Sequence, residues 1–327
     1  MAKLKTLLKA LLSLFLLAYL VQMAEPVKII QVLGKVWYDN RMIYVLLAVG
    51  IYLLSMLIFT LRWQILVKGY GLQVTIFDLF RYYWIGLFFN NFLPTSIGGD
   101  IIRIYHLIEK SGDRVAGFTS VFTERLLGVT STLLLTLISL LILSGQLENN
   151  SLIYIACGLL VIIIAFFILV FNDHLLKVLE RLMNPLKFLR LGERLLKLLN
   201  AIRFYQNAKS IYLKILSISI IGQVLIIIMI YILSLAIGLN ISLLYLFLVV
   251  PISFLLTMLP SINGIGFREG GYVILLGNIG IGKAEAISLS FLSIIIPMLV
   301  SVGGGILFML NRKISKKKEL EFVGKNI

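Results

Sequence analysis

Charged residues, cysteine and histidine are scarce in this sequence, and each shortage excludes a class of protein or site. Only 14% of the 327 residues are charged and 60% are hydrophobic, and a mean hydropathy of +1.03 excludes a soluble globular protein. The single cysteine, Cys157, excludes a disulfide framework and a thiolate metal site. The two histidines, His106 and His174, lie too far apart in sequence to show a metal-ligand spacing. We therefore expect an integral membrane protein that uses no metal and no cofactor.

Long apolar runs recur along the whole chain, and most of them have the length of a membrane-spanning helix. The continuous runs are residues 7–21, 42–61, 126–144, 152–171, 215–237 and 286–310. A helix needs roughly 20 apolar residues to cross the hydrocarbon core, so these runs are long enough or nearly so. Two further regions, 77–107 and 241–281, are interrupted by polar residues, glycine and proline. The pattern predicts an all-α integral membrane protein with six full spans and two re-entrant or broken hairpins.

The positions of lysine and arginine predict how these segments thread through the membrane. The formal charge of +15 comes from 30 basic and 15 acidic residues, and in a membrane protein such an excess indicates topology rather than binding to nucleic acid. With a cytoplasmic N-terminus, the basic clusters fall inside, including the one that contains Arg62. The outside keeps only Lys28, Lys35, Arg41 and Lys283. The positive-inside rule therefore predicts a plasma-membrane protein with both termini in the cytoplasm.

The two broken regions must each enter and leave on one face, because a single crossing would turn later basic clusters outward. A re-entrant hairpin and two thin crossings both meet this condition. The closing limb of the second region, 272–281, is about half the length of a spanning helix, which favours re-entry. Residues 172–214 carry Lys and Arg among leucines at helical spacing and predict a basic amphipathic cytoplasmic segment. Residues 311–327 are expected to form a basic cytoplasmic tail.

The order of segments and a short sequence match predict an inverted-topology repeat. The series span, span, broken region, span occurs in residues 1–145 and again in 151–310, where it starts from the opposite side of the membrane. Residues 93–103 read LPTSIGGDIIR and residues 259–270 read LPSINGIGFREG. Non-helical backbone at membrane depth must face protein or water, so the two tips should meet near the midplane. The residues expected to shape the hairpin backbones are Pro94, Gly98, Gly99, Pro260, Gly264 and Gly266.

Charged residues in or beside the broken regions are the main candidates for substrate binding: Asp100, Arg103, Glu124, Arg125, Arg268 and Glu269. An embedded charge costs about 2.5–3.5 kcal/mol even on the mildest scale, so it indicates function by default. Arg103 and Arg268 are expected to bind a phosphate from opposite sides, since a guanidinium donates two parallel hydrogen bonds to phosphate oxygens. The structural alternative is internal ion pairing that only fixes helix packing, by Glu124 with Arg125 and with Asp100 or Arg103.

Uncharged polar and aromatic residues in the same regions give weaker signals. Asn90, Asn91, Ser96 and Asn263 fit either of two roles, hydrogen bonds to a lipid headgroup or caps of the broken helices. Two tyrosines and a tryptophan, Tyr82, Tyr83 and Trp84, fit an interfacial aromatic belt. The three consecutive glycines at 303–305 indicate tight helix packing or a kink in the last span.

Several segments together resemble the membrane domain of the lysylphosphatidylglycerol synthase/flippase family: LRWQILVKG after the second span, NNFLPTSIGGDIIRIYHL, TSVFTERLLG and LPSINGIGFREGG. The resemblance covers nearly the whole chain. It implies a domain that moves aminoacylated phosphatidylglycerol, or other lipid-linked groups, between leaflets. Fused members of that family carry a soluble transferase domain, whereas here a lysine-rich tail follows residue 310. We therefore expect transport and no aminoacyl-transfer activity.

The leading hypothesis is a lipid translocase whose hairpins bind a phosphate-bearing headgroup while the acyl tails stay in the bilayer. The alternatives are a coupled transporter of a small soluble anion, a membrane-embedded transferase acting on a lipid phosphate, and a membrane component of a lysylphosphatidylglycerol synthase system. Expected partners are membrane lipid, a separate lipid-modifying synthase and a second copy of the chain, and not nucleic acid. Residues 277–284, GNIGIGKA, resemble a nucleotide-binding loop but lack its magnesium-binding Ser or Thr.

Overall fold

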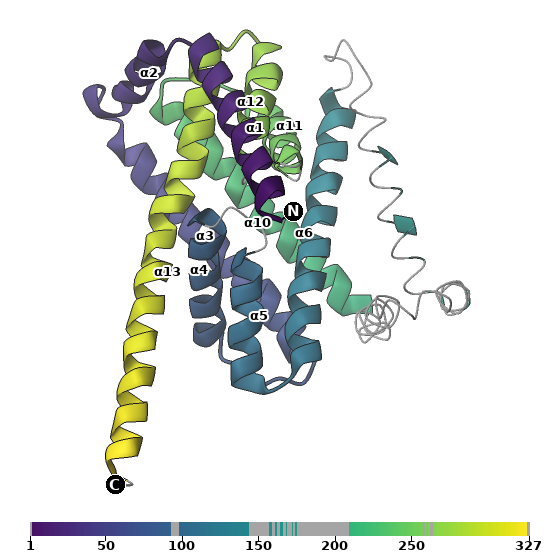
Figure 1. Cartoon of the computed structure of the whole chain (residues 1–327). Coiled ribbons are helices and arrows are strands. Elements are labelled where there is room, and N and C mark those ends of the chain that lie inside the picture. The colour runs from purple at the N-terminus through teal and green to yellow at the C-terminus, as the bar shows by residue number, and fades with distance from the viewer. Residues whose placement is uncertain are drawn as a thin grey trace.

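The computed structural model describes residues 2–92, 98–143, 209–257 and 264–325, with a few single positions between these ranges. Regular structure in these residues is α-helical (Figure 1). In chain order the helices are α1 (Ala2–Met23), α2 (Pro26–Tyr38), α3 (Met42–Gly69), α4 (Ile76–Phe92), α5 (Gly98–Ser111), α6 (Arg114–Leu143), α10 (Lys209–Ala236), α11 (Leu243–Leu256), α12 (Phe267–Gly277) and α13 (Lys283–Lys325). The prediction of an all-α protein is confirmed for this part of the chain.

Some sequence predictions fall on parts of the chain that are not described. These are most of the predicted span 152–171, most of the basic segment 172–214, and the residues Pro94, Ser96, Pro260 and Asn263. The predicted basic tail, 311–327, continues the last helix, because α13 extends to Lys325.

Four helices of the described chain are long and apolar enough to cross a membrane. They cover Met42–Gly69, Arg114–Leu143, Ile211–Ala236 and Lys283–Leu310, which lie in α3, α6, α10 and α13. Each coincides with a span predicted from the sequence. The first predicted span, 7–21, lies within α1, whose described part, Leu14–Met23, is long and apolar enough to cross only together with α2, to which it is bent by 81°. If that bent pair counts as one crossing, the described residues hold five candidate spans, and the sixth stays a prediction.

Helix α2 was not predicted from the sequence. Its start agrees with simple propensity, because Pro26 occupies the first helical turn, where a missing N–H does not matter. Ile29, Val32 and Val36 are buried, whereas Trp37 on the opposite face is 75% exposed. Since α2 contacts α13, it is an amphipathic helix whose apolar stripe covers the start of that longer helix.

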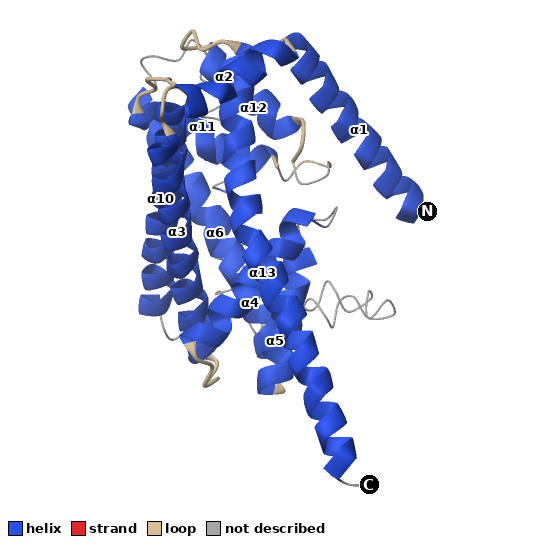
Figure 2. Ribbon diagram, turned by 90° about the vertical axis from the view of Figure 1, so that its left-hand side faces the viewer, coloured by secondary structure: helices blue, strands red, loops and turns tan. Residues whose placement is uncertain are grey.

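The two broken regions are pairs of short helices that pack against each other, α4 with α5 and α11 with α12. Their lengths are 17, 14, 14 and 11 residues, all below the roughly 20 residues of a spanning helix. We call α4–α5 the first hairpin and α11–α12 the second hairpin. They lie toward opposite ends of the bundle (Figures 1 and 2). These lengths favour re-entrant hairpins over pairs of full crossings.

Local capping explains where the first hairpin begins and ends. The hydroxyl of Thr75 accepts a hydrogen bond from the Asp78 N–H at 3.1 Å, which satisfies a free donor at the start of α4. Helix α5 ends before Gly112, which has φ +74°, a conformation that glycine adopts without steric penalty. The next residue, Asp113, accepts hydrogen bonds from the N–H groups of Val115 and Ala116, both at 2.9 Å, and so starts α6.

Helices from the two halves of the chain interleave. Helix α10 packs along α3, and α13 packs along α4. The predicted tight packing at Gly303–Gly305 is confirmed: a Cβ on Gly304 would collide with the backbone of Trp84, and one on Gly305 would lie 2.7 Å from the ring of Phe88. The indole of Trp84 donates to the carbonyl of Val300 at 2.8 Å. The ring therefore lies in the contact between α4 and α13, and its role as an interfacial anchor stays a prediction.

Candidate functional site

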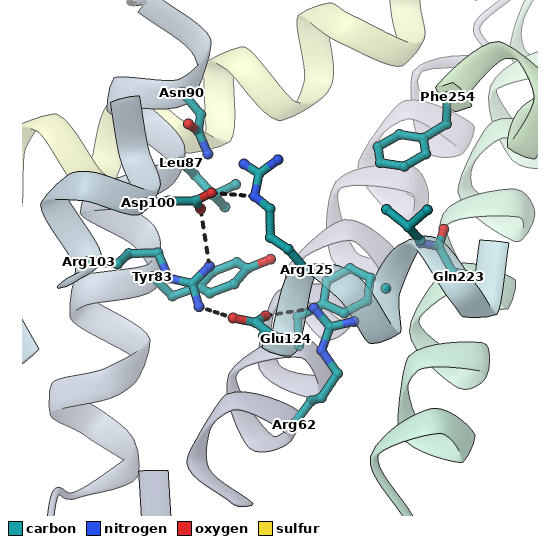
Figure 3. Close-up of a pocket in the computed structure, with 13 residues that line it drawn as sticks. Arg62, Tyr83, Leu87, Asn90, Asp100, Arg103, Glu124, Arg125, Gln223 and Phe254 are labelled. Atoms are coloured by element: carbon teal, nitrogen blue, oxygen red, sulfur yellow. Dashed lines mark hydrogen bonds and ion pairs between the residues drawn. The ribbon is translucent and has the colours of Figure 1, made fainter. Parts of the chain in front are cut away.

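A cavity of about 290 Å³ opens between α3, α4, α5, α6, α10 and α11 (Figure 3). Its lining residues are Phe59, Arg62, Tyr83, Leu87, Asn90, Asp100, Arg103, Glu124, Arg125, Gly128, Val129, Gln223 and Phe254. Both hairpins contribute, because Asn90 and Asp100 belong to the first hairpin and Phe254 to α11 of the second. The cavity therefore lies where the two hairpins approach each other.

Glu124 on α6 is the centre of a buried ion-pair network. The side chain is only 2% exposed and accepts a hydrogen bond from Arg62 Nη2 at 2.6 Å. Its other carboxylate oxygen pairs with Arg103 Nη2. Arg62 also donates from Nη1 to the hydroxyl of Ser219 on α10 at 3.1 Å. A carboxylate held by two guanidinium groups is well compensated, so this network joins α3, α5, α6 and α10 without leaving Glu124 unpaired.

Asp100 continues the network toward the cavity. Its carboxylate lies 3.7 Å from Arg103 Nη1 and pairs with Arg125 Nε. The charges therefore alternate along one line, from Arg62 through Glu124, Arg103 and Asp100 to Arg125 (Figure 3). Arg125 is at the exposed end of this line, with 44% of its side chain accessible, whereas the other four side chains are buried.

Aromatic rings fix the position of the Arg103 guanidinium. Its Cζ atom lies 4.2 Å from the ring centroid of Trp63 and 4.5 Å from that of Tyr83. A cation close to an aromatic ring is attracted by the electron density of the ring, and this attraction is largest where water is excluded. Trp63 is itself held by a 3.2 Å hydrogen bond from Nε1 to the hydroxyl of Ser120. Arg103 is therefore preorganised.

Close contact between the limbs of the first hairpin depends on two glycines. A Cβ on Gly99 would collide with the carbonyl oxygen of Gly86, and one on Gly86 would lie 2.7 Å from the Cγ of Arg103. Within the same contact, Asn90 Oδ1 accepts a hydrogen bond from the Gly99 N–H at 2.8 Å. Asn90 therefore caps α5, one of the two roles predicted for it. Gly98, the first residue of α5, is buried beside them.

The second hairpin pairs its charges locally. Glu269 Oε2 accepts a hydrogen bond from the Gly266 N–H at 2.6 Å, and Oε1 accepts from Arg268 Nε and Nη2 at 3.3 and 3.1 Å. Gly264 and Gly266 have φ angles of +76° and +90°, which confirms the predicted use of glycine in this turn. Neither Arg268 nor Glu269 is among the described residues that line the cavity.

The structure thus brings together some of the predicted site residues. Asp100, Arg103, Glu124 and Arg125 meet at the cavity. Asn91 donates to the carbonyl of Pro297 at 3.3 Å and to the hydroxyl of Ser301 at 3.0 Å, both on α13. Internal ion pairing, the structural alternative, is present among the described residues, where Glu124 pairs with Arg103 and Arg125 pairs with Asp100. Adjacent residues on a helix point about 100° apart, so the two side chains reach different partners.

Two lining residues were predicted to lie elsewhere. Arg62 was assigned to the cytoplasmic cluster, yet α3 continues to Gly69 and Arg62 is 6% exposed. Tyr83 was assigned to an interfacial belt, yet it contacts Arg103. The sequence held one usable signal, because the residues after Arg62, WQILV, remain apolar and predict that the helix continues.

Comparison with known proteins identifies the family. The model of the lysylphosphatidylglycerol synthase TM region matches residues 6–305. The UPF0104 membrane protein PH1989 of Pyrococcus horikoshii is 28% identical over 101 residues, which cover 30% of this chain and 30% of that relative. No solved structure matches the chain significantly. Because the family model covers most of the chain and includes both hairpins, this protein belongs to the family of the lysylphosphatidylglycerol synthase transmembrane region.

Proposed function

We propose that this protein is a translocase that moves a phosphate-bearing lipid between the leaflets of the cell membrane. One observation carries the proposal: three arginines and two carboxylates, Arg62, Arg103, Arg125, Asp100 and Glu124, line a single cavity between apolar helices. Inside a membrane such charges are expensive and mark the path of a substrate or ion. The family name makes aminoacylated phosphatidylglycerol one candidate lipid.

The chemistry of the cavity suits a phosphate. Guanidinium groups bind phosphate oxygens through paired hydrogen bonds and stay charged when water is excluded. Arg125 is the most accessible of the three guanidinium groups, with 44% of its side chain exposed, so it is the group that a phosphate in the cavity would meet first. The described lining residues include no Ser, Cys or His, which favours binding and transport over group transfer.

In this proposal the hairpins form an inverted-topology repeat. The first hairpin enters from the cytoplasm, the second enters from outside, and both termini are cytoplasmic. The lipid phosphate enters the cavity between the tips while the acyl chains remain in the bilayer. The lipid gradient or the membrane potential supplies the energy, and the potential contributes about 2.3 kcal/mol per charge per 100 mV.

Leaflet exchange in liposomes tests the proposal directly. Purified full-length protein is reconstituted with phosphatidylglycerol or its lysyl ester, each fluorescent on an acyl chain, and dithionite reports the fraction that becomes accessible outside. We expect exchange that requires protein and is lost in Arg125→Ala. The matched variant Arg268→Ala removes an equal charge from the second hairpin and shows whether both arginines take part. Absence of protein-dependent exchange of either lipid, even under an imposed potential, contradicts the proposal.

A coupled transporter of a small anion is the second candidate, because a cavity of about 290 Å³ is at the lower end of the size range of ligand sites. Saturable uptake of a soluble phosphate ester into the same liposomes, without lipid exchange, distinguishes this function from the first.

A further inference from the structure

The charges that line the cavity do not cancel. Among the described lining residues, Arg62, Arg103 and Arg125 are cations and Asp100 and Glu124 are anions. Both carboxylates already lie between two guanidinium groups, since Glu124 pairs with Arg62 and Arg103, and Asp100 pairs with Arg103 and Arg125. Among the described lining residues the cations therefore outnumber the anions by one, and the exposed end of the charge line is Arg125.

The remaining lining residues provide no compensating charge. Tyr83, Asn90 and Gln223 are neutral and polar, and the others are apolar or glycine: Phe59, Leu87, Gly128, Val129 and Phe254. An excess charge in a site of low dielectric constant is stabilised when a ligand neutralises it and destabilised when a ligand increases or reverses it. Net ligand charge should therefore control which headgroup binds.

We infer that the substrate of the proposed translocase carries one net negative charge, on a single phosphodiester with a small uncharged headgroup. This inference rests on the proposed function and names the class of lipid, of which phosphatidylglycerol is the simplest example. One phosphodiester neutralises the cavity. A zwitterionic lipid leaves the positive charge in place, and a phosphomonoester with two charges reverses it.

The positive net charge of the described lining residues also excludes a cationic aminoacylated lipid as the preferred substrate. Such a lipid adds ammonium groups to a site that is already positive. Its amines need a carboxylate partner, and both carboxylates of the described lining are already bound by arginines. Binding would require breaking one of these buried pairs, which leaves a guanidinium uncompensated.

A panel of lipids that differ in charge tests this inference in the wild-type protein. Acyl-labelled phosphatidylglycerol, phosphatidylcholine, phosphatidic acid and lysyl-phosphatidylglycerol are compared in the same liposomes by dithionite accessibility. We expect phosphatidylglycerol to exchange faster than the others by about tenfold or more. Native mass spectrometry of the protein with each lipid gives an independent order of binding. Inorganic phosphate, added at increasing concentration, shows whether the phosphate is recognised without acyl chains.

Variants that change the charge count by one unit should move the preference in opposite directions. Arg125→Gln makes the described lining neutral and should slow exchange of phosphatidylglycerol to the rate of phosphatidylcholine. Asp100→Asn raises the charge by one and should favour phosphatidic acid, whose monoester carries a second charge near neutral pH. Lys110→Gln and Asp78→Asn are matched controls, because these residues pair with each other at 3.6 Å outside the cavity. Neither control should change the lipid preference.

The outcomes separate this inference from the function on which it rests. Equal exchange of all four lipids, or preference for the lysyl ester, overturns the charge rule and leaves the translocase intact. Preferences that do not follow the variants also overturn it. If no lipid exchanges, the translocase fails; selective retention of phosphatidylglycerol in native mass spectra then still supports the charge rule, and non-selective retention overturns it. Uptake of inorganic phosphate without lipid exchange would assign the site to a soluble anion. That result would contradict the inference that the substrate is a lipid.

Discussion

The two hairpins have similar sequences, but they use their charges differently. In the first hairpin, Asp100 and Arg103 pair with residues of other helices, namely Arg125 and Glu124 of α6. In the second hairpin, Arg268 and Glu269 pair with each other and with the turn that begins α12. The similar sequences of the two hairpins therefore do not fix the partners of their charged residues; the neighbouring helices do. The first hairpin offers a charged lining to a ligand, whereas the second stabilises its own tip.

The largest expected difference follows from removing the carboxylate that pairs with the arginine of each hairpin, which is Glu124 of α6 for the first hairpin and Glu269 of α12 for the second. Glu124→Gln leaves two buried guanidiniums without their shared anion, and breaking a buried pair typically costs about 3–5 kcal/mol. Glu269→Gln loses the charge that pairs with the partly exposed Arg268, but its amide oxygen can still accept the hydrogen bond from the Gly266 N–H, so the expected cost is about 1–2 kcal/mol. Thermal unfolding of both variants in one detergent should therefore give a much larger drop in Tm for Glu124→Gln.

Equal losses of Tm in these two variants would contradict the distinction between the hairpins. Arg62→Gln provides a further check on the first hairpin, because it removes one of the two partners of Glu124 and should destabilise less than Glu124→Gln does.

Two glycines, one in each hairpin, allow the backbone packing of the two hairpins to be compared. Gly99→Ala in α5 places a methyl group against the carbonyl of Gly86, and such overpacking costs about 1–3 kcal/mol. Gly270→Ala in α12 meets nothing within 4 Å, and replacing a helical glycine with alanine stabilises by about 0.5–1 kcal/mol. The Tm should fall in the first variant and rise slightly in the second. A fall in both would show that the second tip also depends on close contact.

The smallest predicted effect concerns the contact between the first hairpin and α13. Trp84→Phe keeps most of the ring but loses the hydrogen bond to the carbonyl of Val300, which leaves that carbonyl short of a partner and costs about 0.5–1.5 kcal/mol. Trp37→Phe is the control, because Trp37 is 75% exposed. Tm should decrease slightly in the first variant and stay unchanged in the second; the reverse order would contradict the assignment of Trp84 to this contact.

Much of the fold could be predicted from the sequence, because the length of an apolar run and the residues that interrupt it are local properties of the chain. The hairpin regions, the four long spans and the gathering of Asp100, Arg103 and Glu124 were all predictable from hydropathy and embedded charge. The identity of ion-pair partners was not, since it depends on which helices become neighbours. Hydropathy also placed Arg62 at the end of a span, because a charged residue interrupts an apolar run. It cannot show that a neighbouring helix supplies an acidic partner for that charge, as α6 does with Glu124.

The bend between α1 and α2 was missed for a different reason. The predicted span ended at residue 21, and the amphipathic segment that follows it, α2, is too short and too polar on one face to stand out in a search for apolar runs. The distinguishing feature is Pro26, which starts a new helix, together with the spacing of Ile29, Val32 and Val36 on one face.

The glycine contact at Gly304 limits how the molecule can move. A slide of α4 along α13 by one helical turn would bring the Trp84 backbone against Val300 or Phe308, whose side chains would fill the space that Gly304 leaves open. The first hairpin and α13 therefore travel as one rigid body. A change in access to the cavity therefore has to come from another part of its lining, such as α11, which supplies Phe254 and lies outside the ion-pair network that joins α3, α5, α6 and α10.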